Sequence, residues 1–262
     1  MSKQEVTKRK QPESLKHLTL LQKKQLRENK VRENIIKDIK KNNPEFKNLK
    51  AEDLTDMQFR YLEKGIRYQG VFDIETSDFD PNEKFIICYV MRIRDILTGE
   101  EQEVADKITK ADIQSAVDNQ NFHFDKRLLE TLSHNLKYCD HVVGHFSSKF
   151  DMPYFRSRCL LTKQPELIPE YGSIRFGDTW RMMKTSMKAK RNTLVNFISQ
   201  TTGNNEKTFV ELKYWYSIYF PASKRWQKSM DYIFDHCVKD VKMTLEGLKV
   251  AEKFNSIGMQ LT

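Results

Sequence analysis

The chain has 262 residues, 39% of them apolar and 31% charged, which allows one large domain with a real core, or a domain with an appendage. No apolar run approaches the roughly 20 residues that span a bilayer, which excludes a membrane-spanning protein. Four cysteines without paired spacing exclude a disulfide scaffold, and the basic start lacks the apolar core of a secretory signal. We therefore expect a cytoplasmic protein with reduced thiols that does not bind a membrane.

The positive charge lies at one end of the chain. The formal net charge is +9, and residues 1–50 carry 15 Lys and Arg against 6 Asp and Glu. The other 212 residues hold 30 of each sign. Such an excess predicts a basic arm that contacts phosphates or docks a replication or processing partner. The alternative is a solvated helix that is merely rich in lysine.

The first elements in the chain are helical. Residues 1–13 contain almost no apolar side chains and are predicted to be disordered. Apolar residues then recur at helical spacing over 15–39, which predicts one or two basic amphipathic helices. Asn42 to Pro44 break this pattern. A further helix is predicted over 51–64, ending at Gly65, so residues 1–65 form a basic extension before the domain at 66–262.

Strands come next, followed by alternating strands and helices. The predicted strands cover 71–76, 85–93, 101–106, 141–146 and 173–179, and Gly99 lies in a hairpin turn. Helices are predicted at 125–139, from about Phe150, and from about 230 to 254. This order predicts an α/β fold with a mixed β-sheet flanked by helices.

The strand "VFDIET" (71–76) ends with two carboxylates. Alternate side chains of a strand share a face, so Asp73 and Glu75 point one way while Phe72 and Ile74 point the other. Two unpaired carboxylates in a buried position are costly. An arginine, a lysine or a metal ion is therefore expected beside them, unless the pair lies at an exposed edge.

Two more carboxylates occupy informative positions. Asp151 follows "GHFSSKF" at the expected start of a helix, and Asp240 lies on the last helix one turn after His236. Each of these three residues could instead have a purely structural role. Asp151 could be a helix N-cap, Asp240 could lie on a solvated helix face, and His236 could be a packed histidine. If both carboxylates converge with Asp73 and Glu75, they form the oxygen ligand set that Mg²⁺ or Mn²⁺ prefers. Two such ions could activate water and stabilise the leaving oxygen of a phosphodiester.

Three stretches together resemble the exonuclease motifs of the DEDD superfamily, the ribonuclease H-like 3′–5′ exonucleases. They are "FDIET", "GHFSSKFDMPYF" and "HCVKDV", in the family order, and "GDTW" (177–180) falls where these proteins carry an Asp-Thr pair. The resemblance covers about 66–255 and is greatest to proofreading domains of family B DNA polymerases and their stand-alone phage or viral relatives. The matching residues are Asp73, Glu75, Gly144, Phe150, Asp151, Pro153, Tyr154, Cys237, Asp240 and Val241.

The resemblance implies a ribonuclease H-like fold and a two-metal site that uses Mg²⁺ or Mn²⁺. Its metal ligands would be Asp73, Glu75, Asp151 and Asp240, with His236 as general base. The residues that it places at the substrate are Ile74, Thr76, His145, Phe146 and Phe150.

Two positions depart from the family pattern. Phe146 stands where the family usually has asparagine, which affects substrate binding more than chemistry. His236 stands at the spacing of the family tyrosine, whereas the histidine branch places its residue where this chain has Asp235. A histidine with a pKa near 6.5 could still accept a proton from the attacking water.

These observations predict a metal-dependent 3′–5′ exonuclease acting on single-stranded nucleic acid, with DNA favoured and RNA possible. The alternatives are a catalytically impaired nucleic-acid-binding module and a structure-specific endonuclease on the same fold. Phe146 and His236 favour the binding module, and the four carboxylates oppose it. The abundance of lysine, asparagine and isoleucine is typical of an AT-rich genome and suggests a phage or viral protein in its host's cytoplasm.

Overall fold

The computed structural model describes residues 19–204 and 210–255, so the predicted disordered stretch 1–13 lies outside the described residues. The chain divides into two compact units, Met1–Glu63 and Lys64–Thr262. Within the described ranges, no helix has the length and apolar character needed to cross a membrane.

The first unit is helical. Helix α1 spans Leu20–Asn42, and the Thr19 hydroxyl caps it by accepting a hydrogen bond from the Gln22 amide. The single helix predicted over 51–64 is wrong in extent. A short 3-10 turn, η3, occupies Ala51–Asp53, and α2 spans only Asp56–Leu62 because Thr55 starts it with a capping box. Another 3-10 turn, η2, covers Pro44–Phe46.

A five-stranded sheet forms the middle of the second unit, with strand order β3-β2-β1-β4-β5. The strands are β1 Tyr68–Thr76, β2 Ile86–Asp95, β3 Glu101–Lys107, β4 His141–Gly144 and β5 Arg175–Asp178. β3, β2 and β1 pair antiparallel, whereas β1, β4 and β5 pair parallel. The predicted α/β fold with a mixed sheet is thus confirmed and is consistent with a ribonuclease H-like fold.

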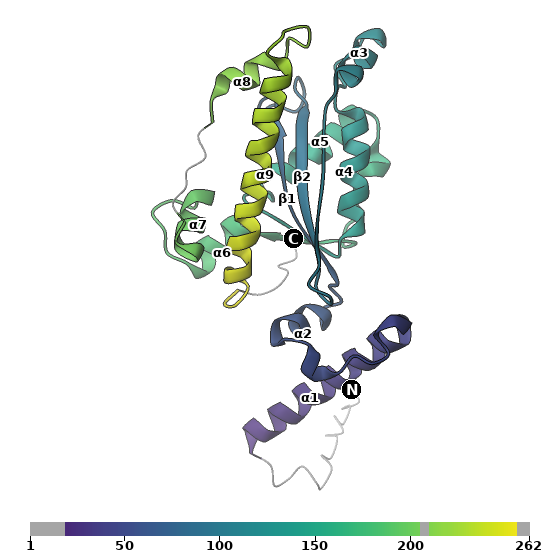
Figure 1. The fold of residues 1–262 in the computed structure, drawn as a ribbon, viewed down its shortest axis with the longest axis vertical. Helices are drawn as coiled ribbons and strands as arrows, with labels where there is room; N and C mark the ends of the chain where they lie inside the picture. Colours follow the sequence, from purple (N-terminus) through teal and green to yellow (C-terminus); the bar gives the residue numbers. More distant parts are fainter. Residues whose placement is uncertain (1–18, 205–209, 256–262) are drawn as a thin grey trace, which may run out of the picture. The chain divides into compact units, whose positions relative to one another are not determined.

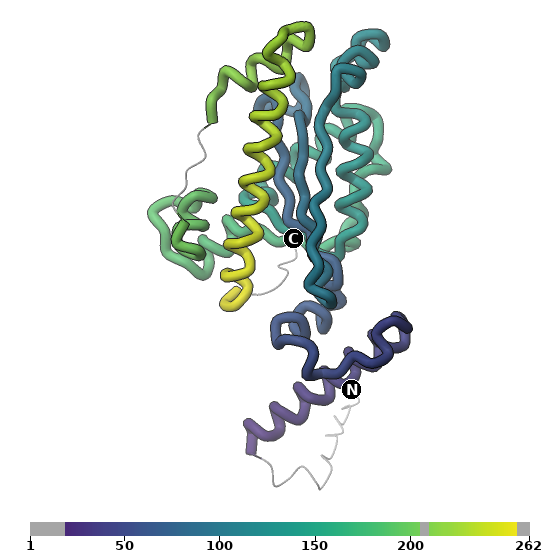
Figure 2. The backbone as a smooth tube through the Cα atoms, in the orientation of Figure 1, coloured from purple at the N-terminus to yellow at the C-terminus, as the bar shows by residue number. Residues whose placement is uncertain are grey.

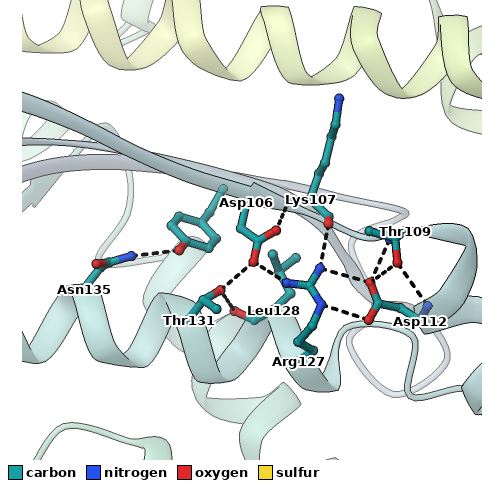
Figure 3. A network of polar contacts seen from close by, with 9 residues as sticks. Asp106, Lys107, Thr109, Asp112, Arg127, Leu128, Thr131 and Asn135 are labelled. Carbon is teal, nitrogen blue, oxygen red and sulfur yellow. Dashed lines mark hydrogen bonds and ion pairs between the residues drawn. The ribbon is translucent and has the colours of Figure 1, made fainter.

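Helices cover both faces of this sheet. The long helix α9, Trp226–Ala251, packs along β1 and β2 (Figures 1 and 2). Figure 3 shows the sheet between α9 on one side and α4, Lys126–Tyr138, on the other. Further elements of this unit are α5 Asp151–Leu161, η4 Pro165–Leu167, α6 Thr179–Ser186, α7 Leu194–Thr202 and α8 Leu212–Ser217. Helix α9 begins earlier than predicted, at Trp226, whose indole N–H donates to the Ile218 carbonyl.

A polar network joins β3 to α4 through a helix that the sequence interpretation missed, α3 at Lys110–Asp118. Thr109 and Asp112 form its capping box, which was the available signal. The Arg127 guanidinium binds the carboxylates of Asp106 and Asp112 and the carbonyl of Lys107 (Figure 3). The network attaches the edge strand β3 to α4, and β3 in turn pairs with β2.

Candidate active site

Strand β1 presents two carboxylates on one face near its end. Phe72 and Ile74 point into the core and are 1% and 4% exposed, so Asp73 and Glu75 share the opposite face, as predicted. β1 is the central strand, between β2 and β4. The two carboxylates are therefore held in a rigid, largely buried position.

Asp151 reaches the same place from the start of α5. It is not the N-cap of this helix, since that position belongs to Phe150. The side chain is 3% exposed, and its Oδ1 accepts a hydrogen bond of 3.2 Å from the Ile74 amide. Burial, together with the charges of Asp178 and Glu75, raises its pKa to about 7, although two backbone hydrogen bonds oppose the shift.

α9 contributes the third group of site residues. His236 and Asp240 lie one turn apart, and His236 Nδ1 is 3.0 Å from Glu75 Oε1 and 3.7 Å from Asp240 Oδ2. Cys237 follows His236 in the helix, and its Sγ lies 3.5 Å from Asp73 Oδ2. The end of β1 is thus joined to the middle of α9 by polar contacts.

The four carboxylates influence one another electrostatically. Burial raises the pKa of Asp73 well above its usual range, and the negative charges of Asp151, Glu75 and Asp240 raise it further. Burial also raises the pKa of Glu75, against the hydrogen bond from His236. The predicted convergence of these residues from β1, α5 and α9 is therefore present in the fold.

The donor set suits a hard divalent cation, but the side chains are not in a ligand arrangement. Across residues 19–204 and 210–255, no group of three His, Cys, Asp or Glu side chains is positioned to hold a metal ion. Glu75 is paired with His236 instead. Buried carboxylates with raised pKa values are the groups that a cation would stabilise, so the chemistry fits and the side-chain positions would have to adjust.

The five residues expected at the substrate differ in their accessibility. The side chains of Ile74 and Thr76 are buried, at 4% and 9% exposure. His145 contacts Thr179 Oγ1 at 2.8 Å and the Asn192 carbonyl at 3.2 Å, so both of its nitrogens have protein partners. The side chains of Ile74 and Thr76 are thus buried and the nitrogens of His145 are engaged, so side-chain contact with a substrate would have to come from other residues.

Phe146 and Phe150 are the more accessible pair. The Phe146 side chain is 41% exposed and packs edge-on against Trp180, with ring centroids 5.3 Å apart. Its backbone has a φ of +64°, a left-handed conformation that is unusual for a bulky residue. Phe150 is half-buried and lies edge-on to Phe79, which is 82% exposed. Aromatic side chains therefore belong to the loop that leads into Asp151 at the start of α5.

Asp178, at the end of β5, holds this loop and was not among the predicted site residues. Its carboxylate accepts hydrogen bonds from the amides of Phe146, Ser148 and Trp180 and from the Ser148 hydroxyl. The close approach also needs Gly144, where a Cβ would lie 2.6 Å from the Ser147 Cβ. The "GDTW" tetrapeptide was the signal for Asp178. No sequence signal pointed to Trp215 on α8, which packs edge-on against His236 at 6.1 Å.

Comparison with known proteins supports the fold. No protein-family model matches the chain, and no curated protein is significantly similar to it. Among solved structures, the family B DNA polymerase from the hyperthermophilic archaeon Pyrobaculum calidifontis superposes with a TM-score of 0.50 at 17% identity. The match covers 71% of this chain and 24% of the polymerase chain, so this chain spans about a quarter of that protein's length. The chain is therefore similar in fold to part of a family B DNA polymerase.

Proposed function

We propose that this protein is a metal-dependent 3′–5′ exonuclease that hydrolyses phosphodiester bonds of single-stranded nucleic acid, with DNA as the favoured substrate. One observation carries the proposal: Asp73, Glu75, Asp151 and Asp240 come from three separate elements and lie close enough for the charges of the other three to raise the pKa of Asp73, with His236 beside Glu75 and Asp240. The fold likeness to a DNA polymerase and the three motifs agree with a role on nucleic acid.

The four carboxylates would hold Mg²⁺ or Mn²⁺, two ions in the proposed mechanism. Bound divalent ions would lower the pKa of an attacking water and neutralise charge on the phosphate oxygens. Asp73 on the central strand and Asp151 beside it would fix the position of the reacting phosphate. Burial of this cluster keeps bulk water away and strengthens each electrostatic contact.

In the proposed mechanism, His236 would act as the general base. A proton on Nδ1 can be donated to Glu75 Oε1, which lies 3.0 Å away. This leaves the lone pair of Nε2 as acceptor, and Nε2 is buried without a hydrogen-bond partner among the described residues. Glu75 would thus select the tautomer that can take a proton from the attacking water.

The experiment uses single-stranded DNA and RNA labelled at the 5′ end, incubated with Mg²⁺, Mn²⁺ or EDTA. A ladder of labelled products that shortens from the 3′ end and disappears in EDTA supports the proposal. The variants Asp73→Ala, Asp151→Ala and Asp240→Ala should each remove nearly all of this activity. Internal cleavage of a circular single strand would instead indicate an endonuclease.

A second candidate is a nucleic-acid-binding module without catalysis, favoured by the pairing of Glu75 with His236 in place of a ligand arrangement. That alternative predicts tight binding of single strands without any cleavage at millimolar Mn²⁺. Wild-type protein that leaves both labelled substrates intact would establish it over the exonuclease.

A further inference from the structure

A concave site lies at the β5 edge of the sheet, and none of the four carboxylates lines it. It is a cavity of about 860 Å³ lined by the loop 168–174, by residues of β5 and by side chains from α5 and α6. Ser148, Lys149, Lys64 and Gly65 also line it. Nothing in the proposed chemistry uses this cavity.

The cavity is positively charged. Its lining contains five basic and two acidic residues: Lys64, Lys149, Arg156, Arg175, Arg181, Asp140 and Glu170. Asp140 is already engaged, because its Oδ2 accepts the amide hydrogens of Arg67 and Tyr68 at 2.9 and 2.8 Å. Within the described part of the chain, neither Arg156 nor Arg181 forms an ion pair with a carboxylate. Since residues 51–262 carry equal numbers of both signs, this excess is local.

Aromatic side chains line the cavity together with the cations. Tyr171 is 91% exposed and precedes Gly172, whose φ of +83° forms the turn that presents the ring. The Arg156 guanidinium lies 5.9 Å from the centroid of the Phe176 ring. Arginine side chains together with an exposed aromatic ring suit a phosphate backbone with stacked bases.

The cavity connects with the candidate active site through one loop. Ser148 and Lys149 line it, while Asp178 binds the Ser148 amide and hydroxyl at 3.0 and 2.6 Å. Asp151 follows only two residues after Lys149. A strand with its 3′ end at the carboxylates could therefore continue past this loop into the basic cavity.

We propose that the cavity at the β5 edge binds the phosphates of single-stranded nucleic acid, with one base stacked on Tyr171. The direction of the strand rests on the proposed exonuclease function, whereas binding itself does not. Arginine forms paired hydrogen bonds with phosphate oxygens, and the ring on the turn supplies the stacking surface. An acidic peptide is the rival occupant, because β5 is an edge strand.

The test measures fluorescence anisotropy of a labelled 20-nucleotide single strand in EDTA, where no cleavage occurs. The double variant Arg156→Gln/Arg181→Gln is compared with the control Lys224→Gln/Lys228→Gln, which removes the same charge from exposed positions outside the cavity. The Kd of the cavity variant should rise about tenfold, and its salt slope should fall by about 1.4, which is about 0.7 for each of two phosphates. The control should change the Kd by less than about twofold.

Tyr171 provides a variant that cannot fail through misfolding, since its side chain is exposed. Tyr171→Ala should weaken binding about tenfold through loss of stacking, whereas Tyr171→Phe should bind like the wild type. Equal weakening by the cavity and control doubles would overturn the proposal. So would tighter binding of an oligoglutamate than of the single strand, because it would assign the cavity to an acidic peptide.

Activity separates this proposal from the first one. On a 5′-labelled trinucleotide, which can make fewer contacts with the cavity than a 20-nucleotide strand, the cavity double should lose less activity than on the longer strand. On the 20-nucleotide strand, it should raise KM about tenfold with little change in kcat. An inactive wild type that still binds through Arg156, Arg181 and Tyr171 would refute the nuclease and leave the cavity proposal standing.

Discussion

Nδ1 of His236 lies 3.0 Å from Oε1 of Glu75, and this contact joins the last helix to the central strand. Burial lowers the pKa of His236, but the hydrogen bond to Glu75 and the charges of Asp240 and Glu75 outweigh it, so the pKa lies above its usual value. The imidazole is 11% exposed, which shields this interaction from solvent. The same contact would control both the charge and the tautomer of the proposed base.

Activity should therefore depend on the protonation of His236. Below its raised pKa the ring is an imidazolium, which cannot accept a proton, so the rate should rise with pH through a midpoint above about 6.5 when Glu75 keeps this contact. His236→Ala should lower kcat about 10²–10⁴-fold. The measurement is a pH–rate profile at saturating Mn²⁺.

His236→Tyr is the matched variant, because it restores the residue that the family usually has at this spacing. This variant should retain substantial activity, and its rate should no longer show the fall at low pH that protonation of His236 causes. If His236→Ala cleaved at the wild-type rate with an unchanged profile, then His236 would only pack beneath the site.

The metal-free site should destabilise the protein at neutral pH. The pKa of Asp151 is about 7 in the folded protein, above its ordinary 3.8. The folded state therefore binds the proton more tightly, and its stability falls as pH rises from about 4 to 7. Asp151→Asn in EDTA at pH 8 should raise the free energy of unfolding, by on the order of 2–4 kcal/mol at most.

Urea unfolding measures this effect, and Glu246→Gln is the control. Glu246 lies on α9 with an exposed side chain, so its substitution should change stability by less than about 0.5 kcal/mol. At pH 4 the advantage of Asp151→Asn should shrink, because the wild-type carboxyl is then protonated in the fold. An advantage independent of pH would contradict the charge explanation.

Metal binding should reverse this destabilisation. A ligand of the native state stabilises it by mass action, so Mn²⁺ at about 100 times its Kd should add about 2.7 kcal/mol. We expect millimolar Mn²⁺ to raise the Tm of the wild type and to leave the Tm of Asp73→Ala unchanged. Thermal unfolding by circular dichroism makes the comparison, and a shift that persists in Asp73→Ala would place the ion elsewhere.

The parts of the site that follow from local pattern were predictable. The alternation in "VFDIET" fixes Asp73 and Glu75 on one face, and the four-residue spacing puts His236 and Asp240 one turn apart. Each is a property of one element. The motif order then supplied the relation between elements, including Asp151, which spacing alone could not give.

Relations created only by folding were not predictable. Glu75 and His236 are 161 residues apart, and their hydrogen bond depends on how α9 crosses β1. The left-handed backbone of Phe146 depends on the Asp178 carboxylate that binds its amide 32 residues away. No periodicity records either contact, because each is decided by tertiary packing.

Removing residues 1–50 should leave a catalytic body without net charge, because these residues carry the whole excess of +9. Affinity for single strands should fall, and the salt slope should flatten by about 0.7 for each phosphate that this segment neutralises in the full-length chain. Turnover at saturating substrate should change little. The measurement is Kd against salt concentration. An unchanged slope would mean that this segment faces a protein partner or solvent instead of the nucleic acid.

The buried ion pair of Arg158 and Asp125 offers a sharp test of what supports the site. The two side chains are 3% and 0% exposed and form hydrogen bonds of 2.7 and 2.8 Å. Arg158 also donates to the Pro81 carbonyl, and Asp125 accepts from the Ile86 amide, so the pair ties the segment after β1 to α5. Arg158→Ala leaves a buried carboxylate without its partner and should cost about 3–5 kcal/mol.

Arg156 is the natural control, two residues earlier on the same helix. Its side chain is exposed, so Arg156→Ala should change the free energy of unfolding by less than about 0.5 kcal/mol. Urea unfolding in EDTA compares the two variants without interference from metal binding. The large loss for Arg158→Ala would come from the buried contacts of its guanidinium, the ion pair with Asp125 and the hydrogen bond to the Pro81 carbonyl. Equal stability of both variants would show that the pair at Asp125 contributes nothing to holding α5 in place.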